Sequence, residues 1–285
     1  EKIKVDTKYA EMSVTLSNVR SIEFDAATHA AQINFVNGDQ LSGQLGDSAI
    51  AVKTIFGQAS IPVEKIARVQ VRRGGIHGLP EGVVLHYSFD SDDGAKVTDT
   101  SGSGNDGEIQ GAPTYTKEGK VGGAMSFTDR QVILVKNPAN MDLQDFTISA
   151  WIKRGSLEKV SNFIEDGVVA TCGQNGYGMG LHRDGSIYLC KVGINAVFSP
   201  CKINDQDFHH IAVTKKGSTV VFYLDGVAFP ANNFDTHFEF GTGFGVGARP
   251  DGGLVATFIG TIDEVTVFNR PLSANEIKDI YDSQK

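Results

Sequence analysis

The sequence of 285 residues predicts an all-β protein, in which a small β domain precedes a two-sheet jelly roll that ends in a short helix. Three observations lead to this prediction. Apolar and polar residues alternate along many short segments, as they do in half-buried strands. Glycine (33 residues) far outnumbers proline (8 residues) and separates these segments, as tight turns require. Helical spacing is found in one segment, close to the C-terminus.

The composition argues against several classes of protein. Lys and Arg total 26 and Asp and Glu total 34, so the formal net charge is −8. Binding to nucleic acid depends on cationic contacts to phosphates, so we expect no nucleic-acid partner. No run of 18 apolar residues is present, so we expect no transmembrane segment. Hydrophobic residues make up 40%, which is enough for a packed core.

Glycine and charge divide the chain into two regions. Residues 1–73 contain four of the 33 glycines and carry nine basic and eight acidic residues. The remaining chain contains 29 glycines and carries 17 basic and 26 acidic residues. Between them, residues 74–82 read GGIHGLPEG, a composition typical of a linker. We therefore predict a small β domain at 1–73, a linker at 74–82 and a second domain at 83–285.

The first region contains an internal repeat with an offset of 47 residues. Residues 7–16 (TKYAEMSVTL) align with residues 54–63 (TIFGQASIPV). One copy covers about residues 31–71, and the other begins in the middle of the unit. Two interpretations remain open. The chain is cut inside the repeat, or the short copy completes the sheet of the long copy.

Each repeat unit is expected to consist of short strands. In the long copy, Asn37-Gly38-Asp39 is a turn sequence suited to positive φ angles. The order of strand, Asn-Gly turn and further short strands is loosely similar to small SH3-like or Sm-like β barrels. The RNA binding of Sm proteins is not expected here, because this region is nearly neutral. A small β scaffold or spacer is the simplest interpretation.

The second region is dominated by strands and tight turns. Residues 83–89, 146–152 and 220–224 have strand composition. Asp184-Gly185 and Asp225-Gly226 each stand between apolar runs, which is a strong hairpin signal. Many short strands with glycine turns predict a sandwich or jelly roll of about 200 residues.

A single helix is expected at the end of the chain. Ser273 and Glu276 form a capping-box sequence, and Ile277, Ile280 and Tyr281 follow at helical spacing.

Six segments in order resemble the laminin-G-like, concanavalin A-like lectin/glucanase jelly roll. They are LHYSFD (85–90), DTSGSGNDG (99–107), GKVGGAMSF (119–127), FTISAWI (146–152), FHHIAV (208–213) and residues 260–277. Together they span nearly all of residues 83–282. The resemblance implies two sheets with a concave face. Its members are mostly carbohydrate-binding or adhesion modules, but the fold does not define a ligand.

The resemblance also implies a calcium site. In some family members a calcium ion links the N-terminal loop of the jelly roll to its last strands. The corresponding positions here are Asp90, Asn105 and Asp263, which the resemblance brings together. Calcium prefers such oxygen ligands. The alternative is a solvated acidic loop at Asp90 and an Asp263 that caps backbone amides.

Carbohydrate binding requires aromatic faces and planar hydrogen-bonding groups near the loops. Trp151 lies in a family strand that is normally part of the core, so it is not a candidate. The candidate ligand-binding residues are Tyr177, His182, Arg183, Tyr188, His237 and Arg249.

The cysteines and two adjacent histidines have structural interpretations as well as functional ones. Cys190 and Cys201 flank a turn-like segment, so they form either a disulfide across a hairpin or two buried thiols. Cys172 is expected to be a small buried hydrophobic residue. His209 and His210 are adjacent, so on a strand they point to opposite faces and do not share a metal. At least one of them is expected in the core.

Catalytic signatures are missing from the sequence. Glucanases with this fold place paired carboxylates on one strand, in a Glu-x-Asp-x-x-Glu pattern, and no such run is found. We therefore expect no enzyme. The leading hypothesis is an extracellular, periplasmic or cell-surface recognition or adhesion module that binds a glycan, with a structural calcium ion. The alternatives are a structural or protein-interaction module of the bacterial surface and, third, a degenerate glycoside hydrolase fragment.

Overall fold

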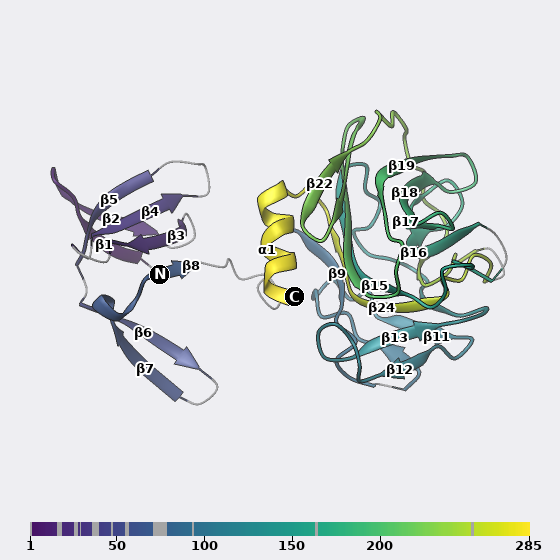
Figure 1. The fold of residues 1–285 in the computed structure, drawn as a ribbon, viewed down its shortest axis with the longest axis horizontal. Coiled ribbons are helices and arrows are strands. Elements are labelled where there is room, and N and C mark those ends of the chain that lie inside the picture. Colours follow the sequence, from purple (N-terminus) through teal and green to yellow (C-terminus); the bar gives the residue numbers. More distant parts are fainter. Residues whose placement is uncertain are drawn as a thin grey trace. The chain divides into compact units, whose positions relative to one another are not determined.

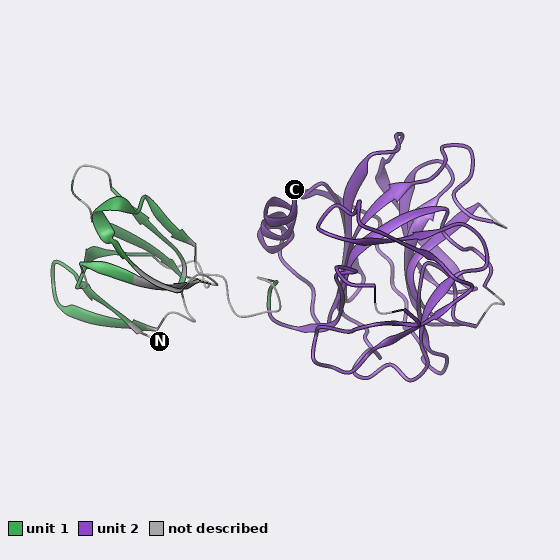
Figure 2. Ribbon diagram, turned by 90° about the horizontal axis from the view of Figure 1, so that it is seen from below, with its two compact units in different colours: residues 1–80 green, residues 81–285 purple. Residues whose placement is uncertain are grey.

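The structure is a computed structural model that describes residues 2–15, 19–25, 28, 30–35, 40–46, 48–54, 57–70, 79–92, 94–162, 165–251 and 254–285. The chain divides into two compact units, Glu1–Pro80 and Glu81–Lys285 (Figure 2). The division falls inside the glycine-rich and proline-containing stretch 74–82, of which residues 74–78 lie outside the described part.

The smaller unit is built on one six-stranded antiparallel sheet in the order β2-β1-β5-β4-β3-β8 (Figure 1). Its strands are β1 (Lys2–Asp6), β2 (Glu11–Thr15), β3 (Val19–Phe24), β4 (Ala31–Phe35), β5 (Gln40–Leu45) and β8 (Arg68–Gln70). A separate hairpin consists of β6 (Ala49–Thr54) and β7 (Gly57–Pro62), and the short helix η2 (Val63–Lys65) follows it. The turn predicted at residues 37–39 lies outside the described residues.

The core of the smaller unit is small. Alternation along the strands turns one set of apolar side chains inward. The buried members are Val5, Val14, Val19, Ile22, Ala31 and Ile33.

The two copies of the repeat have different surroundings. The hairpin β1–β2 and the hairpin β6–β7 are equivalent in sequence. Strand β1 pairs with β5 through Val5 and Leu45, and β3 pairs with β4 through Ile22 and Ile33. The short copy therefore completes the sheet of the long copy, which is the second of the two interpretations. Among the described residues, β6 and β7 pair with each other alone.

The larger unit contains two antiparallel sheets, with one hydrophobic core cluster that draws side chains from both. The first sheet has the order β12-β13-β24-β15-β20-β21-β22, with β9 also paired to β24. The second has the order β10-β11-β14-β23-β16-β17-β18-β19. This arrangement confirms the predicted all-β fold with a two-sheet jelly roll and a short C-terminal helix.

The strands of the first sheet are β9 (Val83–Tyr87), β12 (Thr114–Thr116), β13 (Ala124–Phe127), β15 (Phe146–Arg154), β20 (Phe208–Lys216), β21 (Thr219–Leu224), β22 (Val227–Pro230) and β24 (Gly260–Phe268). Those of the second sheet are β10 (Lys96–Val97), β11 (Gly107–Gln110), β14 (Val132–Val135), β16 (Asp166–Cys172), β17 (Tyr177–His182), β18 (Ser186–Lys191), β19 (Asn195–Lys202) and β23 (Phe244–Val246).

Both predicted hairpin turns are confirmed. Asp225 and Gly226 connect β21 to β22 and have φ angles of 51° and 77°. Two consecutive positive φ angles define a type I′ turn, which matches the right-handed twist of a hairpin. Gly185, with a φ angle of 90°, lies in the turn between β17 and β18.

The C-terminal helix α1 (Ala274–Gln284) begins as the capping box predicts. The Ser273 side chain accepts a hydrogen bond from the Glu276 amide, and the Glu276 side chain accepts one from the Ser273 amide. Ile277 and Ile280 are buried. The helix lies on the outer side of the first sheet (Figure 1), where Tyr281 stacks on Trp151 at 5.6 Å between ring centroids. Trp151 is therefore buried, but between sheet and helix and not between the two sheets.

Cys190 and Cys201 are two separate thiols and do not form the disulfide that was the other interpretation. Cys190 lies opposite Ala196 in the β18–β19 hairpin, so Cys201 is several residues too far along β19 to face it. All three cysteines are free. Cys172 belongs to the core, as expected.

The adjacent histidines on β20 point to opposite faces, as predicted. His210 is fully buried, and its Nε2 lies 2.8 Å from the Ser149 Oγ atom. His209 is partly exposed and bonds to the carboxylates of Asp205 and Asp225.

Candidate functional site

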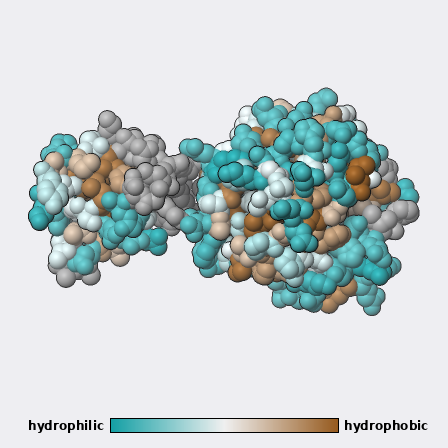
Figure 3. All heavy atoms as spheres, turned by 90° about the horizontal axis from the view of Figure 1, so that it is seen from above, coloured by the Kyte–Doolittle hydropathy of each residue, from teal (hydrophilic) through white to brown (hydrophobic). Residues whose placement is uncertain are grey.

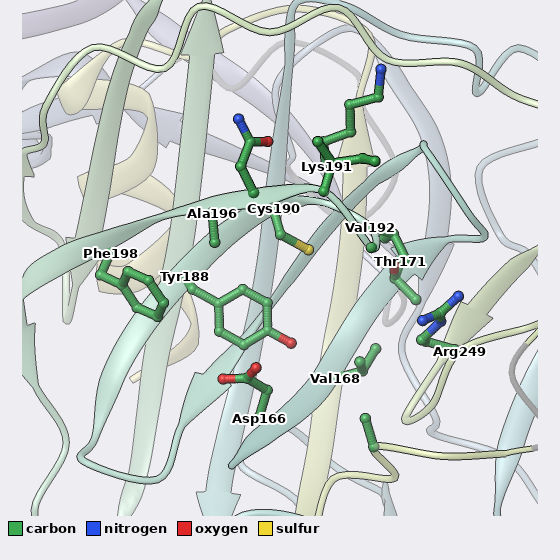
Figure 4. Close-up of a pocket in the computed structure, with 14 residues that line it drawn as sticks. Asp166, Val168, Thr171, Tyr188, Cys190, Lys191, Val192, Ala196, Phe198 and Arg249 are labelled. Atoms are coloured by element: carbon green, nitrogen blue, oxygen red, sulfur yellow. The ribbon is translucent and has the colours of Figure 1, made fainter. Parts of the chain in front are cut away.

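A pocket lies on the outer face of the second sheet, over β16, β17, β18 and β19 (Figure 4). Alternation along β18 decides which side chains reach it. Ile187 and Leu189 belong to the core cluster, so Tyr188 and Cys190 point to the opposite face. The same rule turns Phe198 of β19 outward, since Val197 is in the core.

Two glycines of β17 make room for this pocket. Gly178 and Gly180 occupy outward positions between the core residues of the strand. A Cβ atom on Gly180 would lie 2.5 Å from the Tyr188 hydroxyl oxygen, and one on Gly178 would lie 2.4 Å from Thr171 Oγ1. The Tyr188 side chain therefore lies across β17 at a position where no other residue would leave space for it.

The cavity has a volume of about 270 Å³. Apolar and polar groups both line it, as is usual for pockets that bind small organic molecules. The lining residues are Asp166, Val168, Thr171, Tyr188, Cys190, Lys191, Val192, Gly193, Ile194, Asn195, Ala196, Phe198, Arg249 and Ala256.

Asp166 supplies a carboxylate to the pocket. Its Oδ1 atom is buried and has no hydrogen-bond partner among the described residues. In Figure 4 this carboxylate lies beside the side chain of Tyr188. Burial raises the pKa of Asp166, and the Asp166 charge in turn helps to raise the pKa of Tyr188 and Cys190. The pocket thus contains a hydrogen-bond acceptor that the protein itself leaves unused.

The rim of the pocket is apolar and exposed. Phe198 is 47% exposed, although large aromatic side chains are usually covered. Its ring lies 6.2 Å from that of Tyr188 and 5.6 Å from that of His182. Ile194, in the β18–β19 turn, is 63% exposed. An exposed aromatic ring beside polar groups suits a ligand with both C–H and O–H surfaces.

The two cationic side chains of the pocket are already engaged. Arg249 bonds to Asp251 and to Gln174. Lys191 Nζ lies 2.9 Å from Glu239 Oε1. These ion pairs hold the two side chains in place at the edge of the cavity.

One carboxylate and one thiol are found among the residues that line the pocket. Asp166 is the single carboxylate among the lining residues, whereas glycoside hydrolysis uses two. Burial raises the pKa of Cys190 to about 12, so this thiol stays protonated and is a weak nucleophile. The arrangement is suited to holding a ligand by hydrogen bonds and ring contacts.

Three of the six predicted ligand-binding residues lie at this pocket or its rim. Tyr188 and Arg249 line it. His182 contacts the rim through Phe198. Arg183, in the turn after β17, pairs with Glu165 at 2.9 Å and does not line the cavity.

Two of the predicted ligand-binding residues are elsewhere. The prediction for Tyr177 is wrong, because its side chain is fully buried in the core and its hydroxyl donates to the Met141 carbonyl oxygen. A shift of the register by one residue would have been needed to bring it to the outer face. His237 is exposed in the segment after β22 and does not line the pocket.

The sequence reasoning missed Asp166, Phe198 and Lys191. Asp166 of β16 and Phe198 of β19 occupy outward positions, so their signal is register. Lys191 is the last residue of β18 and has the parity of the inward residues of that strand, so alternation does not predict it. The alternation of glycine in residues 176–180 was the usable clue, because outward glycines on a central strand mark a place where another group approaches closely.

The predicted calcium ligands come together only in part. Asp90 Oδ1 accepts a bond from the Gly123 amide, and Asp263 Oδ2 accepts from the Lys120 and Val121 amides, so both carboxylates meet the loop before β13. Asn105 is engaged elsewhere, which corrects the prediction: its amide group donates to Val84 and Ala139 carbonyls and accepts from the Ala139 amide.

The electrostatics of this acidic region follow from burial. Burial, opposed by backbone hydrogen bonds, raises the pKa of Asp263 to about 7. Burial and the neighbouring charges of Asp263 and Asp90 raise that of Glu264 to about 8. Within the described residues, no group of three or more His, Cys, Asp or Glu side chains is arranged to hold a metal ion. Any cation here would depend on backbone carbonyls and water as well as on Asp90 and Asp263.

No helix among the described residues is long and apolar enough to cross a membrane. On the face shown in Figure 3, hydrophobic side chains of the larger unit are interspersed among hydrophilic ones.

Residues 127–278 match a family described as the concanavalin A-like lectin/glucanases superfamily. The match does not include the smaller unit. No curated protein sequence matches the chain.

Several solved structures are similar to this one. Domain 4 of AbnA, a GH43 extracellular arabinanase from Geobacillus stearothermophilus in complex with arabinotriose, has a TM-score of 0.55 and 21% identity, with 70% of this chain and 98% of that domain covered. The binding domain of Paraclostridial Mosquitocidal Protein 1 has a TM-score of 0.54 and 14% identity, with 71% and 52% covered. A Trypanosoma rangeli sialidase has a TM-score of 0.54 and 13% identity, with 90% and 42% covered. The chain thus spans about half of the toxin domain and less of the sialidase, and these identities establish the fold alone.

Proposed function

This chain belongs to the concanavalin A-like lectin/glucanase superfamily, and we propose that it is a non-catalytic recognition module that binds carbohydrate in the pocket over β16–β19. The observation that carries the proposal is the pocket itself. It combines an exposed ring, Phe198, with an unpartnered carboxylate oxygen on Asp166. A sugar offers C–H groups to the first and hydroxyl donors to the second.

Two further observations support this proposal. A structure with the same fold is a domain of an extracellular arabinanase solved with a bound arabinose oligosaccharide. The lining residues contain one carboxylate, which supports binding without hydrolysis. The fold is also found in toxin binding domains, so a surface protein is the alternative partner.

The test is a glycan array probed with the full chain, once with millimolar calcium and once with EDTA. We expect binding to one glycan class in both conditions. The Phe198→Ala variant should lose about tenfold in affinity, because the ring contact is removed. Leu157→Ala is the matched control, since Leu157 is equally exposed (47%) and does not line the pocket.

Two outcomes would contradict the proposal. If a folded sample binds no glycan on the array, a protein is the partner of this chain instead of a carbohydrate. Equal binding by Phe198→Ala and the unmodified chain would place the glycan outside this pocket.

We also propose that a structural calcium ion binds at Asp90 and Asp263. The donors fit this ion, because they are hard oxygens and two carboxylates meet at one loop. Bound calcium would join that loop to β24. We expect calcium, and not magnesium, to raise the melting temperature, and Asp90→Asn to remove this effect. An unchanged melting temperature would exclude the ion.

The related domains also support a location outside the cytoplasm, at the cell surface or in the periplasm. The arabinanase is described as extracellular. Fractionation of the producing cells, followed by immunodetection of the chain, tests this part of the proposal. Detection in the cytoplasmic fraction alone would contradict it.

A further inference from the structure

The charged groups around the pocket are paired, with one exception. Cationic side chains at the cavity and its rim each have an acidic partner. The ion pairs are Lys191–Glu239 (2.9 Å), Arg249–Asp251 (3.2 Å), Arg183–Glu165 (2.9 Å) and Lys202–Asp184 (2.6 Å). His182 is also engaged, by Asp184 at 2.9 Å and Glu165 at 3.5 Å. Among the described residues no ion pair joins Asp166 to a cation, although the charge of His182 opposes the effect of burial on the Asp166 pKa.

Asp166 is positioned as an acceptor for a group that comes from outside. Its Oδ1 atom is buried and unpartnered among the described residues. The Tyr188 hydroxyl lies near it in Figure 4, but no hydrogen bond joins the two. A buried carboxylate oxygen without a donor is unfavourable, and a ligand cation would compensate it more fully than a neutral donor.

The rings beside Asp166 favour the same kind of ligand. Tyr188 and Phe198 are tilted by 53°, with their centroids 6.2 Å apart. An aromatic face attracts a cation through its quadrupole, most strongly where water is excluded. A carboxylate and two rings at one cavity are the groups that recognise an ammonium ion.

We propose that the sugar recognised by this pocket carries a free, protonated amino group, which Asp166 binds beside Tyr188 and Phe198. This inference rests on the proposed function, because it names the class of sugar for the same pocket. The ligand class is an amino sugar that is not N-acetylated. A primary ammonium group fits better than a quaternary one, because Asp166 needs an N–H donor.

Acidic sugars are the class that this pocket disfavours. A uronic acid would bring its carboxylate next to Asp166. The guanidinium of Arg249 and the ammonium of Lys191 are already neutralised by Asp251 and Glu239, so they offer little compensation. Sugars with only hydroxyl groups remain the competing ligand, since a hydroxyl can also donate to Asp166.

The experiment compares sets of three oligosaccharides of equal length and linkage, which differ only in an amino, an N-acetylamino or a hydroxyl group. Several linkages are tested by calorimetry with the full chain, at a pH at which the amine is protonated. We expect the amino form to bind about tenfold tighter than the other two, because hydrogen bonds between ions are about twice as strong as neutral ones. The Asp166→Asn variant should lose this preference.

A matched control separates the pocket from general attraction to an acidic protein. Asp279→Asn removes the same charge from an exposed position on α1, far from the lining residues. It should keep the preference for the amino form. Loss of the preference in both variants would reduce the effect to net charge and overturn the inference.

The failure of this inference differs from the failure of the proposed function. Equal or tighter binding of the hydroxyl or N-acetylamino form overturns the amino-sugar assignment and leaves a carbohydrate-binding module. If a folded sample binds none of the oligosaccharides, both the amino-sugar inference and the proposed function are overturned. Retention of the amino preference by Asp166→Asn also overturns the inference, because the ammonium ion would then bind elsewhere.

Discussion

The outer faces of the two sheets carry similar residues but have different surroundings. On the first sheet, Trp151 and His210 point outward from neighbouring strands, and helix α1 covers both through Tyr281. On the second sheet, Tyr188 and Phe198 point outward, and the cavity lies above them.

The element that packs on each face determines which hydrogen-bond partners the polar atoms of that face have. The Trp151 Nε1 atom donates to Gln284, and Gln284 in turn donates to Glu264, so the helix supplies partners to these groups. The Nδ1 atom of His210, under the same helix, has no hydrogen-bond partner among the described residues. The Asp166 Oδ1 atom has no such partner among the described residues. The difference teaches that strand alternation alone produces outward aromatic residues, whereas what covers them decides their role. Trp151 lies under a helix and is structural, while Phe198 is 47% exposed and is available to a ligand.

Removing the covered ring should have the largest effect. Trp151→Ala should destabilise the larger unit by about 3–5 kcal/mol, because it leaves a cavity under α1 and removes the donor to Gln284 Oε1. Denaturant unfolding of the variant and of Phe198→Ala provides the comparison. A loss as large for Phe198 as for Trp151 would contradict the assignment of the two faces.

Filling the space over β17 should have the next largest effect. A Cβ atom on Gly180 would lie 2.3 Å from the Gly167 carbonyl oxygen and 2.5 Å from the Tyr188 hydroxyl oxygen. Gly180→Ala should therefore cost about 1–3 kcal/mol and displace Tyr188 from the pocket. Thermal unfolding and the glycan assay measure the two consequences. A stable variant with normal binding would show that the glycine is not required for the pocket.

The two adjacent histidines should respond to pH in opposite directions. Burial lowers the pKa of His210 from 6.5 to about 4, so its contribution to stability is present above pH 6.5 and is lost as the pH falls toward 4. The hydrogen bond to Asp225 is the main cause that raises the pKa of His209 to about 9, so its contribution is present below pH 6.5 and is lost as the pH rises through 9.

Melting temperatures over this range, for the unmodified chain and for His210→Gln, test the covered face. The variant should lose less stability than the unmodified chain between pH 6.5 and about 4. Parallel pH profiles would show that His210 is not protected by α1.

The smallest effect is expected for the unpartnered acid. Asp166→Asn removes a buried charge without breaking a hydrogen bond of Oδ1, so stability should stay the same or rise by about 1 kcal/mol or less. Denaturant unfolding measures this change. A marked loss of stability would indicate that Asp166 is structural, and the comparison of the two faces would fail.

Local patterns were sufficient to predict the elements. The positive φ angles at Asp225-Gly226 and the capping box at Ser273 depend on a few consecutive residues, so these predictions were confirmed. The family resemblance also held, because four of its six motifs lie mainly in the strands β9, β15, β20 and β24, which contribute to the core. The prediction for Tyr177 was wrong because the sequence does not tell which face of a strand points to the core when both faces are covered by other parts of the protein.

The sequence by itself determined the all-β class, the strand-forming segments and the helix cap, since these follow from residue spacing and turn chemistry, and the resemblance of its six segments to a known family indicated the jelly roll. Only the tertiary structure decided that Tyr188, Phe198 and Asp166 share a pocket, that Asn105 leaves the Asp90–Asp263 loop, and that Cys190 faces Ala196. The physical reason is that such contacts depend on the register between strands and on what covers each face. A shift by one residue reverses every side chain, and no local pattern records it.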